Sequence, residues 1–149
     1  MSKRRDAIGE MKNRLSTIAI ANGYHTDAGA DIADGEVYEL GPDDPPVSLA
    51  MVVKKETLIQ YQADVKLAFH LPVEVVILVR PDLDDVRGAI EDAIEDVKKA
   101  METGDRQFDG ILANPLRRGE IEPLDRTSGS TVAGAIIPYT LPISEGYGG

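Results

Sequence analysis

The chain has 149 residues, no cysteine and a formal net charge of −10, with 26 acidic residues against 16 basic ones. Such a length is typical of one domain, expected at residues 1–149, and the lack of cysteine excludes disulfides, thiolate metal ligands and cysteine nucleophiles. The negative charge disfavours binding to nucleic acid or anionic lipid, and no apolar run reaches the roughly 18 to 20 residues that span a bilayer.

The first predicted element is an amphipathic helix over residues 4–20. Its apolar positions recur every three or four residues, at Ile8, Met11, Leu15 and Ile18. Asn22-Gly23 follows as a typical helix stop. The turn-rich segment 24–35 contains three aspartates, but their spacing does not match a calcium-binding loop, so we expect an ordinary polar loop.

The next segments alternate between strands and loops. Residues 36–40 and 47–53 are rich in residues that favour strands, and a loop with three prolines separates them. Residues 54–64 mix charged and apolar side chains and leave three alternatives open: a strand extension, a hairpin arm or a helical turn. Residues 71–80 predict a central strand that begins at 66–69, with Pro72 at a bulge or an edge.

A long amphipathic helix is predicted between Pro81 and Gly104. Its apolar stripe consists of Leu83, Val86, Ile90, Ile94, Val97 and Met101. Asp82 stands where an N-cap belongs, and Gly104 can supply the left-handed conformation that ends a helix. We expect the central strand and this helix to form the core.

The C-terminal third is expected to close the sheet. Residues 107–116 predict a short helix or turn, and residues 119–124 and 131–141 alternate as an antiparallel hairpin. The glycine-rich end, from about residue 142 to 149, is expected to be a mobile tail. The fold class is therefore α+β: a mainly antiparallel β-sheet with two amphipathic helices packed on one face, and the other face left for a partner or solvent.

Acidic side chains form the sharpest charge feature. Those of the long helix, with two from the proline loop, are candidates for a partner-binding or lumen-facing surface: Glu91, Asp92, Glu95, Asp96, Asp43 and Asp44. Paired carboxylates can also bind a metal or act in acid–base catalysis, but a solvated helix face is the more common role. We predict neither metal nor cofactor.

No catalytic motif accompanies these carboxylates. No serine lies in a G-x-S-x-G turn that could work with His25 or His70, and no glycine-rich phosphate loop is present. We expect a binding or structural protein and not an enzyme. The apolar and aromatic residues without an evident place in the core are candidate interface anchors: Leu58, Ile59, Tyr61, Tyr139 and Tyr147.

Two motifs give the chain a resemblance to a known family. The first has the form T-I-x-x-x-x-G-Y-x-T-D-x-G and runs from Thr17-Ile18 through Gly23-Tyr24 to Thr26-Asp27 and Gly29. The second, of the type D-I-x-x-A, is Asp96-Val97-Lys98-Lys99-Ala100, with valine in place of isoleucine. With the order of helices and strands, these motifs resemble the tail terminator family of long-tailed phages and prophages.

The resemblance implies a virion structural protein. Such a subunit forms a homo-oligomeric ring, a hexamer in this family, that caps the tube of tail tube protein, ends tail elongation and docks the head completion or connector protein. It implies assembly in the host cytoplasm, a final place at the head–tail junction, and DNA that passes through without specific binding. Two alternatives stay open: a head–tail joining or neck subunit, and a metal- or ligand-binding α+β domain that uses the acidic helix face.

Overall fold

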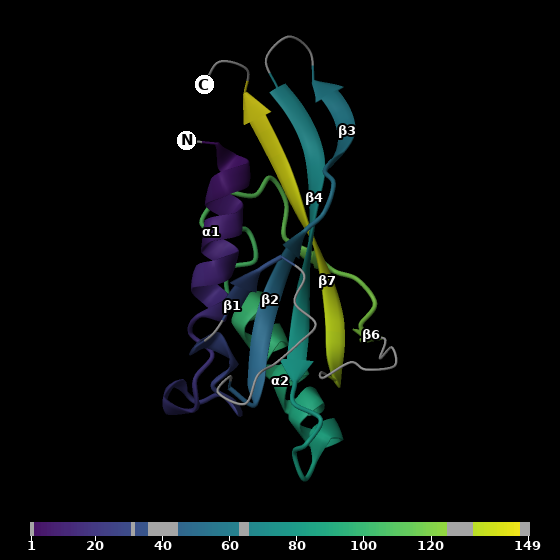
Figure 1. The fold of residues 1–149 in the computed structure, drawn as a ribbon. Helices are drawn as coiled ribbons and strands as arrows, with labels where there is room; N and C mark the ends of the chain where they lie inside the picture. Colours follow the sequence, from purple (N-terminus) through teal and green to yellow (C-terminus); the bar gives the residue numbers. More distant parts are fainter. Residues whose placement is uncertain (1, 31, 36–44, 63–65, 125–132, 147–149) are drawn as a thin grey trace.

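The computed structural model describes residues 2–30, 32–35, 45–62, 66–124 and 133–146. The expected strand at 36–40 lies outside these residues. The elements, in chain order, are α1 (Lys3–Leu15), η1 (Ile20–Asn22), η2 (Ala28–Ala30), β1 (Ile32–Asp34), β2 (Val47–Val53), β3 (Thr57–Gln62), β4 (Lys66–Val79), α2 (Val86–Glu102), β5 (Arg117–Arg118), β6 (Glu122–Pro123) and β7 (Ala133–Gly146) (Figure 1).

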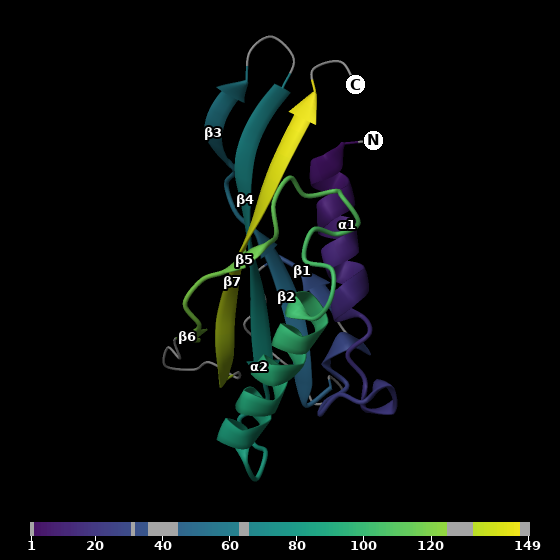
Figure 2. The same ribbon diagram turned by 180° about the vertical axis from the view of Figure 1, so that it is seen from behind.

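The described strands form one mixed sheet in the order β1-β2-β4-β7-β5, with β3 added to β4 and β6 added to β7. Only β1 and β2 pair in parallel; the other pairs are antiparallel. Figure 2 shows both helices on the same side of the sheet, α2 across its lower half and α1 beside its upper half. The predicted α+β class is confirmed.

The core lies between the helices and one sheet face. In β4 every second residue points to this face, and Val73, Val75 and Ile77 are fully buried there. Met11 and Leu15 of α1 cover it, as do residues of α2 such as Val97. These side chains include most of the predicted apolar stripes, because a helix can bury only one face against a sheet.

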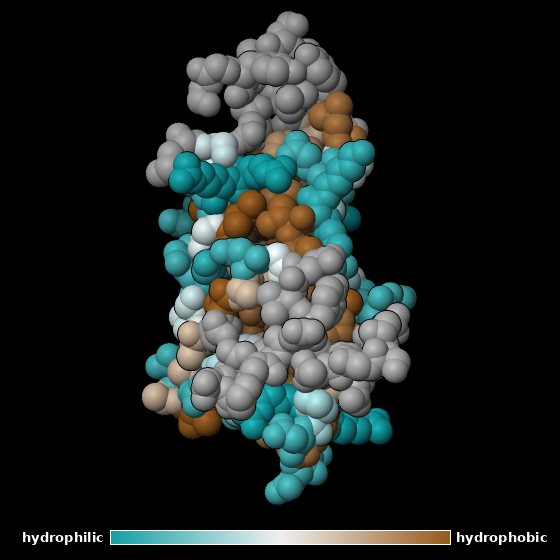
Figure 3. All heavy atoms as spheres, in the orientation of Figure 1, coloured by the Kyte–Doolittle hydropathy of each residue, from teal (hydrophilic) through white to brown (hydrophobic). Residues whose placement is uncertain are grey.

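The opposite face is not as open as the sequence suggests. Ala50 and Val52 of β2 and Leu78 of β4 are buried there in a second, smaller cluster that also contains Leu124. Figure 3, which views the molecule from the side away from α2, shows small apolar areas separated by hydrophilic ones outside the grey atoms. The described surface on this side therefore offers no single large apolar face.

Long strands β4 and β7 pair along 14 residues each. The expectation of a mobile tail from about residue 142 is therefore wrong for residues 142–146, which continue β7; residues 147–149 lie outside the described residues. Beyond the end of β2, strands β3, β4 and β7 continue together as a three-stranded arm, beside α1 and then past its N-terminal end (Figure 1). This answers the open question about residues 54–64: most of them form the edge strand of the arm.

Three prolines lie inside these long strands without breaking them. The N and C=O of a residue in an antiparallel strand point to the same edge, so the carbonyl partner shows where a missing N–H would have pointed. The Pro72 carbonyl accepts from Lys54 N, where the chain leaves β2 for β3, and the Pro138 and Pro142 carbonyls accept from Gly119 N and Ala113 N at the outer edge of β7. The missing N–H of each proline therefore removes no hydrogen bond between β4 and β7.

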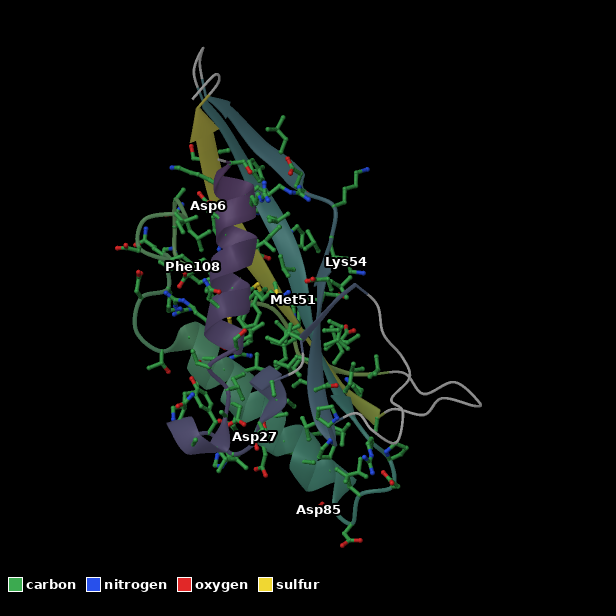
Figure 4. The ribbon with its side chains drawn as sticks, turned by 60° about the vertical axis from the view of Figure 1, so that its left-hand side comes forward. Asp6, Asp27, Met51, Lys54, Asp85 and Phe108 are labelled. Carbon is green, nitrogen blue, oxygen red and sulfur yellow. The ribbon has the colours of Figure 1, made fainter. Side chains whose placement is uncertain are left out.

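The helix boundaries differ from those predicted. Asp85, not Asp82, is the N-cap of α2, and its side chain accepts from Gly88 N at 2.9 Å (Figure 4). Asp82 instead binds the guanidinium of Arg80 at 3.1 and 3.2 Å, which lowers the pKa of its carboxyl group. Gly104 does take a left-handed conformation, with φ +80°, just after the helix ends. The first helix ends at Leu15, and Gly23, with φ +90°, closes η1 instead.

Candidate interaction surfaces

The predicted acidic face of α2 divides into two parts. Glu91, Asp92 and Glu95 are exposed, whereas Asp96 is buried, with 2% of its surface accessible. The prediction that Asp96 belongs to a solvent-facing acidic surface is therefore wrong. Asp43 and Asp44, the other two members, lie outside the described residues.

Asp96 instead holds the segment that follows α1. Its carboxylate accepts hydrogen bonds from His25 N at 2.9 Å, from Thr26 N at 2.8 Å and from Thr26 Oγ1 at 2.7 Å. Hydrogen bonds to a charged acceptor are stronger than those between neutral groups. Asp96 therefore joins two segments that lie 70 residues apart in the sequence.

Residues 17–29, which we call turn 17–29, are braced by a side chain of α2 and by side chains of the segment itself. Lys99 Nζ donates to Gly23 O at 3.2 Å and lies over the Tyr24 ring, 4.6 Å from its centroid. Asp27 Oδ1 accepts from Ile20 N at 2.8 Å, and Asn22 Nδ2 donates to Thr17 O at 2.9 Å. A loop with this many side-chain partners is positioned firmly, although its sequence resembles an ordinary polar loop.

Sequence reasoning missed the role of Asp96, although a signal was present. With 3.6 residues per turn, Ala89, Ala93 and Ala100 lie on the same flank of α2 as Asp96. Small side chains on one helix flank allow another backbone to approach closely. Asp96 has alanines at three nearby positions of this flank, more than any of the neighbouring carboxylates has.

Tyr139 is not the exposed interface anchor that we expected. It is 1% exposed, in the core under α2, and its hydroxyl donates to Glu102 Oε2 at 2.9 Å. Glu102 also accepts from Arg118 Nε at 2.9 Å. Burial, and then the neighbouring carboxylate, raise the pKa of the Tyr139 hydroxyl far above its ordinary value, so the ring stays neutral.

The other interface candidates belong to the arm or to its end. Leu58, in β3, exposes 58% of its surface on the same sheet side as the buried Phe69. Ile59 and Tyr61 also lie in β3, but the described part of the structure does not include their side chains. Tyr147 falls outside the described residues. The arm thus presents at least one large apolar side chain to its surroundings.

A groove that sequence reasoning did not predict lies between α2 and the β6–β7 edge. Its volume is about 550 Å³. It is lined mainly by apolar residues of both sides, including Ile90, Ile94, Ile121, Leu124 and Ala135, and Arg87 and Glu91 contribute the charged groups. Arg87 and Glu91 are exposed, and Ile90 and Ile94 are partly so.

Among the described residues, no three or more His, Asp or Glu side chains are grouped so that they could hold a metal ion. None of the helices that the structure describes is long and apolar enough to cross a membrane.

No protein-family model matches the chain, and no curated protein matches it with significance.

Proposed function

We propose that this chain is a structural subunit of a phage tail: a tail terminator that forms a ring on the tail tube, ends tube elongation and offers the head connector its docking surface. The proposal takes its content from the family resemblance of the two motifs. Its support from the structure is that these motifs, far apart in sequence, meet in one structural unit.

Several motif residues have a physical role in that unit. Asp96 of the second motif accepts both hydrogen-bond donors of Thr26 of the first, and Lys99, which lies between Asp96 and Ala100, binds the Gly23 carbonyl. Ile18 is fully buried, and Gly29 leaves no room for a larger residue, because a Cβ there would lie 2.4 Å from Leu15 O. A resemblance that arose by chance would have no reason to fall on residues that bind one another.

The shape and charge of the molecule suit a ring subunit. Strand β3 has no second strand partner among the described residues, and open sheet edges and apolar side chains such as Leu58 favour contacts with other chains. A contact between two different surfaces of identical chains gives a ring when its rotation closes. The net charge of −10 suits a channel that DNA traverses, since DNA binding needs basic surfaces.

The test is tube capping. Purified chain is added to polymerising tail tube protein, tube lengths are measured by negative-stain microscopy, and the mass of the free chain is measured by light scattering across a concentration series. We expect short tubes with a ring at one end. Tubes of unchanged length, with no added density at either end, would overturn the proposal.

A further inference from the structure

Ile20 is the most exposed large hydrophobic residue among those that the structure describes, with 59% of its surface accessible. It stands at the start of η1 in turn 17–29, where Asp27 binds its backbone N–H and Lys99 binds the carbonyl of Gly23. A braced apolar side chain loses little conformational freedom when it binds, which is typical of an interface anchor.

The groove between α2 and the β6–β7 edge, which we call the α2 groove, could receive such an apolar side chain. Its walls are apolar, with Ile90, Ile94 and Leu124, and its volume of about 550 Å³ exceeds what one isoleucine side chain requires. Its charged groups are Arg87 and Glu91, whereas the charged groups that brace the Ile20 turn are Asp27 and Lys99. Each surface therefore carries one charge of either sign, which allows two opposite-charge pairs across a contact.

The two surfaces lie on opposite flanks of α2. Successive helix residues are rotated by about 100°, so Ile94 and Asp96 are about 200° apart, and Ile90 and Lys99 about 180°. Figure 1 agrees: turn 17–29 is at the lower left and β6 is at the right. One chain therefore cannot join them, whereas a row of identical chains can.

We propose that Ile20 of one copy inserts into the α2 groove of a second copy, in a head-to-tail contact repeated around the ring. This inference rests on the proposed ring-forming function and names the surfaces that build the ring. Because the two surfaces differ, every copy uses both, and the contact continues until the ring closes.

The test uses one anchor variant, two alternative groove variants, and mixtures of the anchor variant with a groove variant. Ile20→Asp removes the apolar anchor, and Ile90→Lys places a charge in the groove; since Ile90 is half-buried, Arg87→Glu with Glu91→Lys is a second groove variant that changes only exposed side chains. Sedimentation velocity is expected to show self-association weakened by at least about thirtyfold for Ile20→Asp and Ile90→Lys, the effect of losing one anchor contact. The double charge variant should also weaken it, because both opposite-charge pairs then become like-charge pairs.

The mixture is the decisive measurement. An Ile20→Asp chain keeps its groove, and a groove variant keeps its Ile20, so one intact contact remains between them. An equimolar mixture should form a dimer and stop there, because neither free surface can add another copy. Val53→Asp, which changes another exposed large hydrophobic residue, at 37%, serves as the control and should leave self-association unchanged.

Three results would overturn the inference. Rings that form as well with Ile20→Asp would show that another surface builds them, and the proposed function would stand. A mixture that stays monomeric would show that the two surfaces do not bind each other. A wild-type chain that is monomeric at every concentration would refute the self-contact, and tube capping would then decide the proposed function separately.

Discussion

Asp96 brings a negative charge into the contact between α2 and turn 17–29. Three donor groups of His25 and Thr26 surround it, and its replacement leaves them without their acceptor. We expect Asp96→Ala to lower the free energy of unfolding by about 3 kcal/mol, since hydrogen bonds to charged groups contribute about 1.5 to 3 kcal/mol and do not add fully. Urea denaturation measures the loss.

The matched control for Asp96 is the residue beside it. Glu95 is exposed on the same helix, and its Lys98 pair, at 3.6 Å, is a surface ion pair. Glu95→Ala should therefore change stability by no more than about 0.5 kcal/mol. Equal losses for the two variants would contradict the role assigned to Asp96.

Tyr139 gives the stability a dependence on pH. Its pKa is raised in the folded chain by burial and by Glu102, relative to about 10 for an exposed tyrosine, so the folded state holds the proton more tightly. The contribution of Tyr139 to the free energy of unfolding is therefore fully present below about pH 10, and it declines as the pH rises above that value.

Tyr139→Phe tests this dependence directly. At neutral pH the variant should lose about 1.5 to 3 kcal/mol of unfolding free energy, the contribution of a hydrogen bond to a charged group such as the Glu102 carboxylate. Between about pH 9 and 11 the wild type should lose stability more steeply than the variant. Parallel curves from urea denaturation over this range would refute the assignment.

At the scale of elements, the close approach of α1 and turn 17–29 depends on Gly29. A Cβ at this position would lie 2.4 Å from Leu15 O and 2.8 Å from Ile18 O, and both are backbone atoms that cannot move independently. Gly29→Ala should therefore destabilise the chain by about 1 to 3 kcal/mol, as overpacking does. Thermal or chemical unfolding measures the change.

Gly9 provides the opposite case. It lies in α1 with nothing within 4 Å of an added Cβ, so Gly9→Ala should stabilise the chain by up to about 1 kcal/mol through helix propensity. The two substitutions are therefore expected to change the free energy of unfolding in opposite directions. A Gly29→Ala variant as stable as the wild type would mean that the turn does not pack as described.

Periodic elements were predictable from the sequence, and elements that depend on a neighbour were not. The apolar stripe of α2 and the apolar runs of β2 and β4 are sufficient to predict these elements, because burial requires those patterns. Strand β3 has no such pattern; it exists because β4 continues past β2 and offers it a partner. The prolines of β7 concealed its length, because their harmless orientation depends on the register with β4.

The same distinction applies to the candidate surfaces. The exposed carboxylates of α2 follow from the helix pattern alone, but the burial of Asp96 depends on turn 17–29, which packs against it. From the sequence, Tyr139 is only an aromatic residue near the end of a strand. Its partner Glu102, which accepts a hydrogen bond from its hydroxyl, lies 37 positions away in the sequence. The groove combines residues of α2 with residues of β6 and β7, so no single stretch of sequence could reveal it.

On the scale of the whole molecule, two regions are proposed to make different contacts: the arm of β3, β4 and β7 with the tail tube, and turn 17–29 and the groove with neighbouring copies in the ring. The arm of β3, β4 and β7 projects past α1 at one end (Figure 1), whereas turn 17–29 and the groove lie beside the helical layer. If lateral contacts build the ring, the arm is available to the tail tube. Leu58→Asp should then leave both ring mass and stability unchanged, within about 0.5 kcal/mol, because Leu58 is mostly exposed.

Leu58→Asp is therefore expected to abolish only the capping of tail tubes. Tubes polymerised with this variant should be as long as tubes polymerised without any terminator. Thr57→Asp is the matched control, since it adds the same charge to the neighbouring residue of β3, whose side chain points to the other face of the sheet. If Leu58→Asp caps tubes as efficiently as Thr57→Asp, the arm does not contact the tube through its apolar side, and the lateral surfaces remain the only ones assigned.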